Sequence, residues 1–188
     1  ILAGTDITLA QTVNSDGTAR TLQVTGSGVT TFGGIVGGTA ELASLTVDGG
    51  GTTLLNAGTV TTAGVQSYTD ALTLGANTAL VTTNSNVSFT STLNSSEALA
   101  TAGTPAPATL SITAGTGDVT FGNIVGGATY TATNGALGAV TLVSATNVGI
   151  NAAFTAASLT QQAGAGSGTT IIGGATTLTG ALGFTGGN

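Results

Sequence analysis

The sequence predicts an all-β fold, a right-handed parallel β-helix (β-solenoid) with short strands and Gly-rich corners. Two observations predict it: short apolar-x-apolar triplets recur along the chain, and longer phrases repeat at a distance. Within a triplet the two apolar residues face one side of a strand, and the middle Thr, Ser or Gln faces the other side. Strands this short are unstable as isolated hairpins, but stacked coil on coil they can enclose a continuous core.

Each triplet is followed by a turn that contains Gly, Asn or Asp, and then by a second short apolar strand. The six triplets begin at Leu22, Leu45, Leu72, Leu110, Val140 and Leu159. Most of the intervals between them lie in the range of roughly 20 to 30 residues that single solenoid coils have, so we expect each triplet to open a coil. The last copy is degenerate, because Gln161 stands where the others carry an apolar residue.

Longer phrases support the same fold. Two pairs of segments are similar. The first pair is GVTTFGGIVGG at 28–38 and DVTFGNIVGG at 118–127. The second pair is 43–55, which contains ASLT followed by GTTLL, and 157–172, which contains ASLT followed by GTTII. In the first pair Phe32 aligns with Phe121, 89 residues further on. Glycines in these phrases are expected at corners, where a positive φ or a close coil contact excludes a Cβ.

One segment interrupts the repeat. Ser95–Pro107 (SSEALATAGTPAP) contains both prolines of the chain, and we interpret it as a loop excursion from a single solenoid domain spanning residues 1–188. The competing fold is a β-sandwich or jelly-roll fibre subunit, which also uses many strands. The brevity of the strands, the aromatic content of 4% and the repeats favour the solenoid.

Composition excludes several functions. Charged residues make up 4% of the chain, Arg20 is its single basic residue, and the formal charge is -6. Nucleic-acid binding is therefore not expected, because little in the chain can neutralise phosphates. Membrane insertion is not expected either, since Gly and Thr interrupt every apolar run well before the ~20 residues of a spanning helix.

Two phrases carry a resemblance to a known class of protein: Val29–Gly58 and Val60–Thr83. They resemble filamentous-haemagglutinin-like repeat regions of large secreted bacterial adhesins, of the two-partner-secretion or autotransporter type. The resemblance implies a right-handed β-helix, a secreted or cell-surface location, and a structural or adhesive role. It carries over no catalytic or ligand residues.

No enzymatic activity, cofactor or metal ion is expected. The absence of His and Cys excludes Ser–His and Cys–His nucleophiles and imidazole metal sites. Calcium at Asp48, Asp70 or Asp118 is an alternative, but we interpret these residues as solvated turn residues. A polysaccharide-active or ice-binding β-helix is a further, weaker alternative. The aromatic side chains are expected in the core or at corners: Phe32, Tyr68, Phe89, Phe121, Tyr130, Phe154 and Phe184.

Two functions remain from different classes. In the first, the chain is part of a passive shaft that extends an adhesin from the cell, with a host or neighbouring cell as a possible partner. In the second, it is a small subunit that stacks end to end with copies of itself into an extracellular filament. The second hypothesis is based on the two terminal segments, Ile1–Leu9 and Ala181–Phe184, which both have the alternating pattern of β-strands. The ends of such a solenoid would expose core side chains and unpaired backbone groups.

Overall fold

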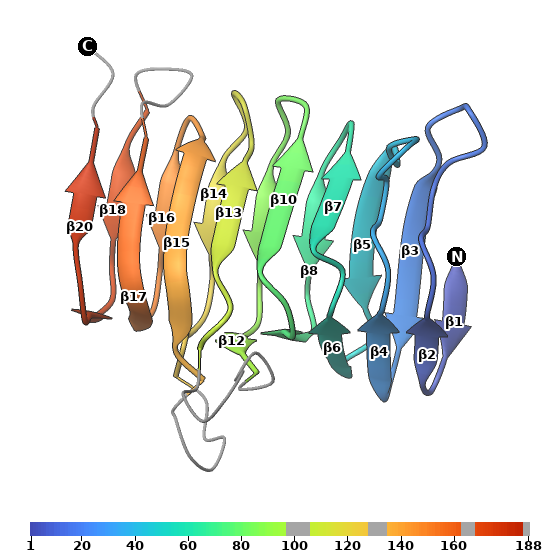
Figure 1. Cartoon of the computed structure of the whole chain (residues 1–188), viewed down its shortest axis with the longest axis horizontal. Coiled ribbons are helices and arrows are strands. Elements are labelled where there is room, and N and C mark those ends of the chain that lie inside the picture. The colour runs from blue at the N-terminus through green and yellow to red at the C-terminus, as the bar shows by residue number, and fades with distance from the viewer. Residues whose placement is uncertain (97–105, 128–134, 163–167, 186–188) are drawn as a thin grey trace.

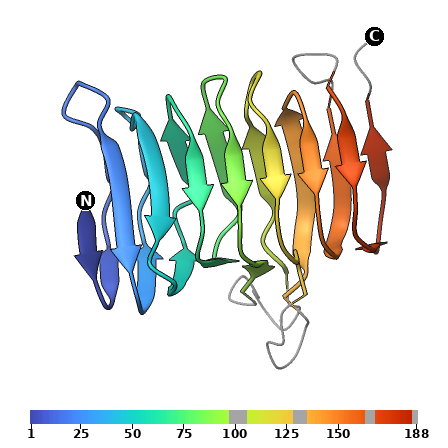
Figure 2. The ribbon, with the colours of Figure 1, turned by 180° about the vertical axis from the view of Figure 1, so that it is seen from behind.

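A computed structural model describes residues 1–96, 106–127, 135–162 and 168–185. The described residues contain strands and no helix, and the strands stack in parallel as a β-solenoid of about 7 turns. In Figure 1 the coils advance from right to left, with strands running upward in front and downward behind, so the winding is right-handed. Figure 2 shows the opposite face, where the strands run downward. The predicted fold class is confirmed.

The chain visits three parallel sheets in turn. The 8-stranded sheet contains β1 (Leu2–Gly4), β3 (Thr21–Gly26), β5 (Ser44–Asp48), β8 (Gln66–Tyr68), β11 (Val87–Phe89), β14 (Val119–Phe121), β16 (Val148–Ile150) and β18 (Thr170–Ile172). The 5-stranded sheet contains β2 (Ile7–Leu9), β4 (Val29–Phe32), β6 (Thr52–Leu55), β9 (Ala71–Leu74) and β12 (Leu93–Ser95). The 7-stranded sheet contains β7 (Thr59–Thr62), β10 (Thr78–Thr82), β13 (Leu110–Thr113), β15 (Leu137–Ser144), β17 (Phe154–Gln161), β19 (Thr176–Leu178) and β20 (Leu182–Phe184), and β20 pairs with β17.

The pairing register gives the coil length. From Leu22 through Leu45 and Gln66 to Val87, paired residues are 23, 21 and 21 positions apart in the sequence. The next two coils have offsets of 32, from Val87 to Val119, and then 29. These two longer coils contain residues 97–105 and 128–134, which lie outside the described residues. Along the 8-stranded sheet these coils therefore have 21 to 23 residues, whereas the offset is 19 from Thr52 to Ala71 and 24 from Val36 to Val60 because the corners differ in length.

The ends of the expected excursion lie together. The backbone N–H of Ala108 donates to Ser95 Oγ at 2.7 Å, so the chain leaves the coil and returns to it at neighbouring points. The sequence prediction of Ser95–Pro107 as an excursion falls mostly on residues outside the described ones. Of its described residues, Ser95 belongs to β12, and the next strand begins at Leu110 opposite Thr78.

The core consists of inward-facing columns that run from coil to coil. The clearest column, on the 8-stranded sheet, contains Leu2, Val24, Val47, Tyr68, Phe89, Phe121, Ile150 and Ile172. The rings of Tyr68 and Phe89 stack with centroids 5.4 Å apart, and those of Phe89 and Phe121 stack at 5.2 Å. Phe121 meets Phe154 edge-on at 5.6 Å. The expected core position is confirmed for these four and for Phe32, whereas Phe184 is half exposed and Tyr130 lies outside the described residues.

The prediction that each triplet opens a coil is wrong. Leu22 and Leu45 lie on the 8-stranded sheet, Leu72 lies on the 5-stranded sheet, and the triplets at 110, 140 and 159 lie on the 7-stranded sheet. The aligned Phe32 and Phe121 also occupy different sheets, the 5-stranded and the 8-stranded one. The repeating unit is therefore a strand with its following corner, and this unit can serve on any of the three faces.

The two copies of the long phrase show this directly. In both copies the first glycine after the Phe-x-x-Ile-Val segment has a positive φ, 71° at Gly37 and 68° at Gly126. A Cβ at either glycine would overlap a carbonyl oxygen of the next coil, that of Thr61 or Thr155. The phrase thus encodes a tight corner, and it forms the same local contacts on two different edges of the solenoid.

Candidate functional site: the glycine-rich corner

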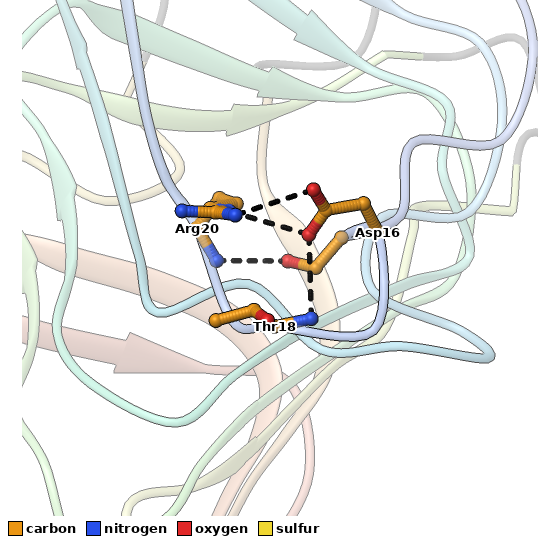
Figure 3. A network of polar contacts seen from close by, with 4 residues as sticks. Asp16, Thr18 and Arg20 are labelled. Carbon is orange, nitrogen blue, oxygen red and sulfur yellow. Dashed lines mark hydrogen bonds and ion pairs between the residues drawn. The ribbon is translucent and has the colours of Figure 1, made fainter.

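Charge is scarce on the described surface, and its one ion pair joins Asp16 and Arg20 (Figure 3). Arg20 Nε lies 3.2 Å from Asp16 Oδ1, and Nη2 lies 3.3 Å from Oδ2. The Arg20 guanidinium, followed by the Thr18 N–H, lowers the pKa of Asp16. Both side chains are about two-thirds exposed, so solvent screens the pair and its effect on stability is small. The single basic side chain of the chain is therefore already engaged.

The corner between the 8-stranded and 5-stranded sheets differs in length between coils. The inward-facing partners at its two ends are six residues apart in two early coils, from Val24 to Thr30 and from Val47 to Thr53. One coil later they are four apart, from Tyr68 to Leu72. The longer turns are rich in glycine, and we call residues 26–30 and 48–53 together the glycine-rich corner.

Glycine is required in this corner because the two turns stack backbone on backbone. Gly49 has a φ of 121°, and a Cβ there would lie 2.5 Å from the carbonyl oxygen of Gly26. A Cβ on Gly51 would lie 2.6 Å from the same oxygen. Gly50, with a φ of 78°, faces open space instead. Side chains are thus excluded from the contact between the turns, and the two backbones approach each other closely.

Aspartates bound the glycine-rich corner on both sides along the solenoid axis. Asp6 Oδ1, from the preceding coil, accepts a hydrogen bond from the Val29 N–H at 2.8 Å. Asp70 Oδ1, from the following coil, accepts one from the Gly50 N–H, also at 2.8 Å. The interpretation of Asp70 as a solvated turn residue is wrong, because the longer turn covers it and leaves it only 3% exposed.

Asp48 lies within the corner but faces outward. Its Oδ2 accepts a hydrogen bond from Gln23 Nε2 at 2.9 Å. The side chain of Thr25 and then that of Gln23 lower the pKa of Asp48. Of the three carboxylates at this corner, Asp70 is therefore the one that the fold encloses.

Three buried oxygen atoms on the inner side of the corner have no hydrogen-bond partner, Thr30 Oγ1, Thr53 Oγ1 and Asp70 Oδ2, and Asp48 Oδ1 is a fourth on its outer side. The side chains of Thr30 and Thr53 are 0% and 2% exposed. Both residues stand in an inward-facing column that continues with Leu72 in the next coil. A buried hydroxyl or carboxylate oxygen without a partner is unfavourable, and native proteins supply partners for nearly all such atoms. No protein group is the partner of these three atoms, so a buried water or an ion is needed to supply one.

Asp118 has a different role, which the local sequence did not reveal. It is the middle member of a ladder along one corner: Asn86 Oδ1 accepts from the Asp118 N–H at 2.9 Å, and Asp118 Oδ1 accepts from Asn147 N–H and Nδ2 at 3.0 and 2.8 Å. Asn147 Oδ1 in turn accepts from the Thr169 N–H. The available signal was an Asn or Asp directly before a strand-opening Val, which recurs at 86, 118 and 147.

Gln66 is a second feature that the sequence patterns did not indicate. It is fully buried between Leu45 and Val87, in a column of Leu and Val residues that ends at Thr170. Its Nε2 donates to the carbonyl oxygens of Val60 at 3.1 Å and Val81 at 2.9 Å. The buried Tyr68 hydroxyl donates to Gln66 Oε1 at 3.1 Å, and burial raises the pKa of Tyr68. The amide therefore links two faces of the solenoid, the 8-stranded and the 7-stranded sheet, in one polar network.

Other kinds of site fit this geometry less well. Among the described residues, no three or more His, Cys, Asp or Glu side chains group as metal ligands, so a cation at the corner would need hydroxyl or backbone oxygens as well. A polysaccharide could not reach the enclosed Asp70, which argues against a carboxylate pair with Asp48. The described part of the chain has no helix long and apolar enough to span a membrane.

The fold defines the class of protein: the chain is a repeat protein of the parallel β-solenoid type. No protein family, no curated protein and no solved structure matches it.

Proposed function

We propose that the chain is a section of a passive β-helical shaft in a large secreted bacterial surface adhesin. The observation that carries this proposal is the continuity of the core column on the 8-stranded sheet, which runs from Leu2 to Ile172 through eight parallel strands. Each coil contacts only its neighbours, so further coils lengthen such a rod without any new kind of interaction. A stiff spacer needs this property more than it needs a binding pocket.

The outer surface supports the same proposal. On the 8-stranded sheet the central outward-facing positions are small and uncharged in most coils: Gln23, Thr46, Ser67, Ser88, Thr120, Gly149 and Ile171. An ice-binding surface needs a long and regular rank of threonines, and this rank contains only two. A neutral hydroxylated surface of this kind suits a passive spacer.

The test is the size and location of the intact polypeptide. Antibodies raised against these 188 residues should label the surface of intact cells of the native source. Under fully denaturing conditions they should detect a band far above 17.7 kDa. A polypeptide found only inside the cell would overturn the proposal.

The second candidate is a self-stacking filament subunit, and one observation favours it. The column residues of the two end coils match in chemistry: Ile172 would stack on Leu2 of a second copy, Leu178 on Leu9, and Phe184 on Val13. Ile172 and Phe184 are 38% and 48% exposed. Uncovered strands with such side chains can pair with a further coil, whether it belongs to the same chain or to a copy.

Sedimentation of the purified 188-residue chain tests this candidate. End-to-end stacking predicts a series of polymers that lengthen with concentration and that Phe184→Asp abolishes. Val65→Asp is the matched control, because Val65 has a similar exposure of 46% but lies in the middle of the chain. A concentration-independent monomer, or equal effects of the two substitutions, would exclude stacking through this end.

A further inference from the structure

We propose that the glycine-rich corner is a calcium site, with Asp70 Oδ2, Thr53 Oγ1 and Thr30 Oγ1 as its side-chain ligands. This inference does not depend on the adhesin proposal, because it rests on three partnerless oxygens and on the charge of one enclosed carboxylate.

The first argument is charge. Asp70 is 3% exposed, and its hydrogen bond to the Gly50 N–H engages Oδ1 and leaves Oδ2 without a partner. Asp48 adds a second carboxylate one coil away, directly after Val47, which is paired with Tyr68. Arg20 is the one basic side chain of the whole sequence, and it is paired with Asp16. A buried carboxylate without a countercharge is strongly unfavourable, so a bound cation is the species that best completes this corner.

The second argument is the direction of the hydroxyl groups. A Cβ at Gly26 would lie 2.5 Å from Thr30 Oγ1, so this hydroxyl points at the turn. Thr53 is its register partner in the next coil. Adjacent parallel strands are about 4.8 Å apart, and the Asp70 carboxylate lies against the turn of Thr53 because its Oδ1 accepts from the Gly50 N–H at 2.8 Å.

The third argument is the type of ligand. The corner offers carboxylate, hydroxyl and backbone carbonyl oxygens, the last from Gly26 and Gly28, which face the stacked turn at Gly51. Calcium accepts six to eight such oxygens in irregular arrangements, whereas magnesium requires a near-ideal octahedron and releases its water reluctantly. A turn built from stacked glycine backbones is therefore better suited to calcium.

The fold also shows where the site ends. Beyond Asp70 the same column contains Leu72, Leu93 and Val125, and the corner shortens to four residues. Further along, the column continues through Phe154 to another threonine, Thr176. Thr30 and Thr53 differ from Thr176 in being adjacent in the column and in lying beneath the long glycine turns.

Calorimetric titration and thermal unfolding of the 188-residue chain test the site. After treatment with a chelator, calcium should bind one site with a Kd of about 10⁻⁴ to 10⁻³ M, the range of extracellular modules, and raise the unfolding temperature, whereas magnesium should do neither. Asp70→Asn should weaken calcium binding at least about tenfold. Asp16→Asn, which removes an exposed carboxylate elsewhere, should leave it unchanged.

A second variant remains informative if Asp70→Asn fails to fold. Thr53→Val keeps the shape of the side chain and removes its partnerless hydroxyl. If that hydroxyl is a ligand, the variant loses most of the stabilisation by calcium. The control is Thr62→Val, because the Thr62 hydroxyl already donates to the Gly64 carbonyl at 2.6 Å; this variant should be less stable but should respond to calcium as the unmodified chain does.

The opposite results are equally clear. If calcium leaves the unfolding temperature and the heat of titration unchanged, the proposal is overturned, and buried water becomes the partner of these oxygens. If Thr53→Val is more stable than the unmodified chain and its response to calcium is intact, Thr53 is not a ligand and the proposed ligand set is overturned.

Discussion

The coils before and after Gln66 have the same backbone ladder but different interiors. In the coils of β3–β7, which we call the polar coils, the central column contains Val24 and Val47, and the corner column contains Thr30 and Thr53. In the coils of β8–β17, the aromatic coils, the central column contains the rings of Tyr68, Phe89 and Phe121, and the corner column contains leucine or valine in its first coils. The corner itself shortens from six residues to four at the same point.

The difference shows that parallel pairing does not determine what fills a solenoid. A large ring fills the aromatic coils, so that a tight corner can close over it. The polar coils have smaller central side chains, and a longer turn of stacked glycines with threonine hydroxyls beneath it completes their interior. Gln66 and Asp70, on the two sides of Tyr68, join the two arrangements through their hydrogen bonds.

The largest loss of stability should come from interrupting the stack of aromatic rings formed by Tyr68, Phe89 and Phe121. Phe121 contacts rings on both sides, at 5.2 and 5.6 Å, so Phe121→Ala should lower the free energy of unfolding by about 3–5 kcal/mol. Val47→Ala, in the same column of the polar coils, should cost only about 2 kcal/mol, because it removes two methyl groups. Urea unfolding at equilibrium measures both. Equal losses would mean that the two interiors are energetically alike.

The boundary between the two regions is tested next. Gln66→Leu leaves the Tyr68 hydroxyl and two carbonyl oxygens without the amide, and should cost about 2–4 kcal/mol. Adding Tyr68→Phe removes the partnerless hydroxyl as well, so the double variant should lose less than the sum of the two single variants. A double-mutant cycle in urea measures this coupling, and strict additivity would show that the two side chains act independently.

Two adjacent glycines separate steric overlap from backbone strain in the polar coils. Gly49→Ala combines a positive φ with a Cβ 2.5 Å from Gly26 O, and should cost about 3 kcal/mol. Gly50→Ala has a positive φ but free space, and should cost about 1 kcal/mol. Thermal unfolding of the pair measures the difference. If the two variants lose the same free energy of unfolding, the two turns do not make the close backbone contact described above.

The smallest expected effect is on the stability of the fold at low pH. Neighbouring hydrogen bonds lower the pKa of Asp48 in the folded chain, so its contribution to stability is complete above the ordinary carboxylate pKa of about 3.9 and is lost as the pH falls through the lowered value. Because the side chain is partly solvated, we expect this contribution to be small. Urea unfolding between about pH 5 and pH 2 should show a shallower decline for Asp48→Asn. An identical decline in the variant would show that the hydrogen bonds to Asp48 do not contribute to the acid sensitivity of the fold.

Local patterns predicted the inward and outward positions within the strands, but not the sheet to which each strand belongs. Alternation in short triplets gave inward and outward positions correctly, as at Leu45 and Val47, because a strand's side-chain period is fixed at two. The face on which a triplet lies was not predictable, because Leu72 and Leu45 have the same local pattern and differ only in which coils stack on them. The interpretation of Ser95–Pro107 as an excursion stays a prediction, because residues 97–105 lie outside the described part of the chain.

The candidate site could not be derived from the sequence for a similar reason. Between Thr69 and the strand-opening Ala71, Asp70 has the local pattern of an ordinary turn residue. It is enclosed only because the turn of the neighbouring coil is two residues longer, which is a relation between segments about 20 residues apart. Asp48 also stands at the start of a turn, and it is partly solvated. Burial of a corner residue in a solenoid thus depends on the difference in length between adjacent turns.

The pairing of each coil only with its neighbours has a mechanical consequence. The hydrogen bonds between coils run along the rod, so tension applied to the chain ends loads the outermost coil first and can release coils one at a time. A coil without an extra segment contains 19 to 24 residues, and its release would exchange an axial rise of about 4.8 Å for an extended length of about 70 Å. Such a molecule would lengthen stepwise under load and absorb work at each step, so a tether built from it would yield before it broke.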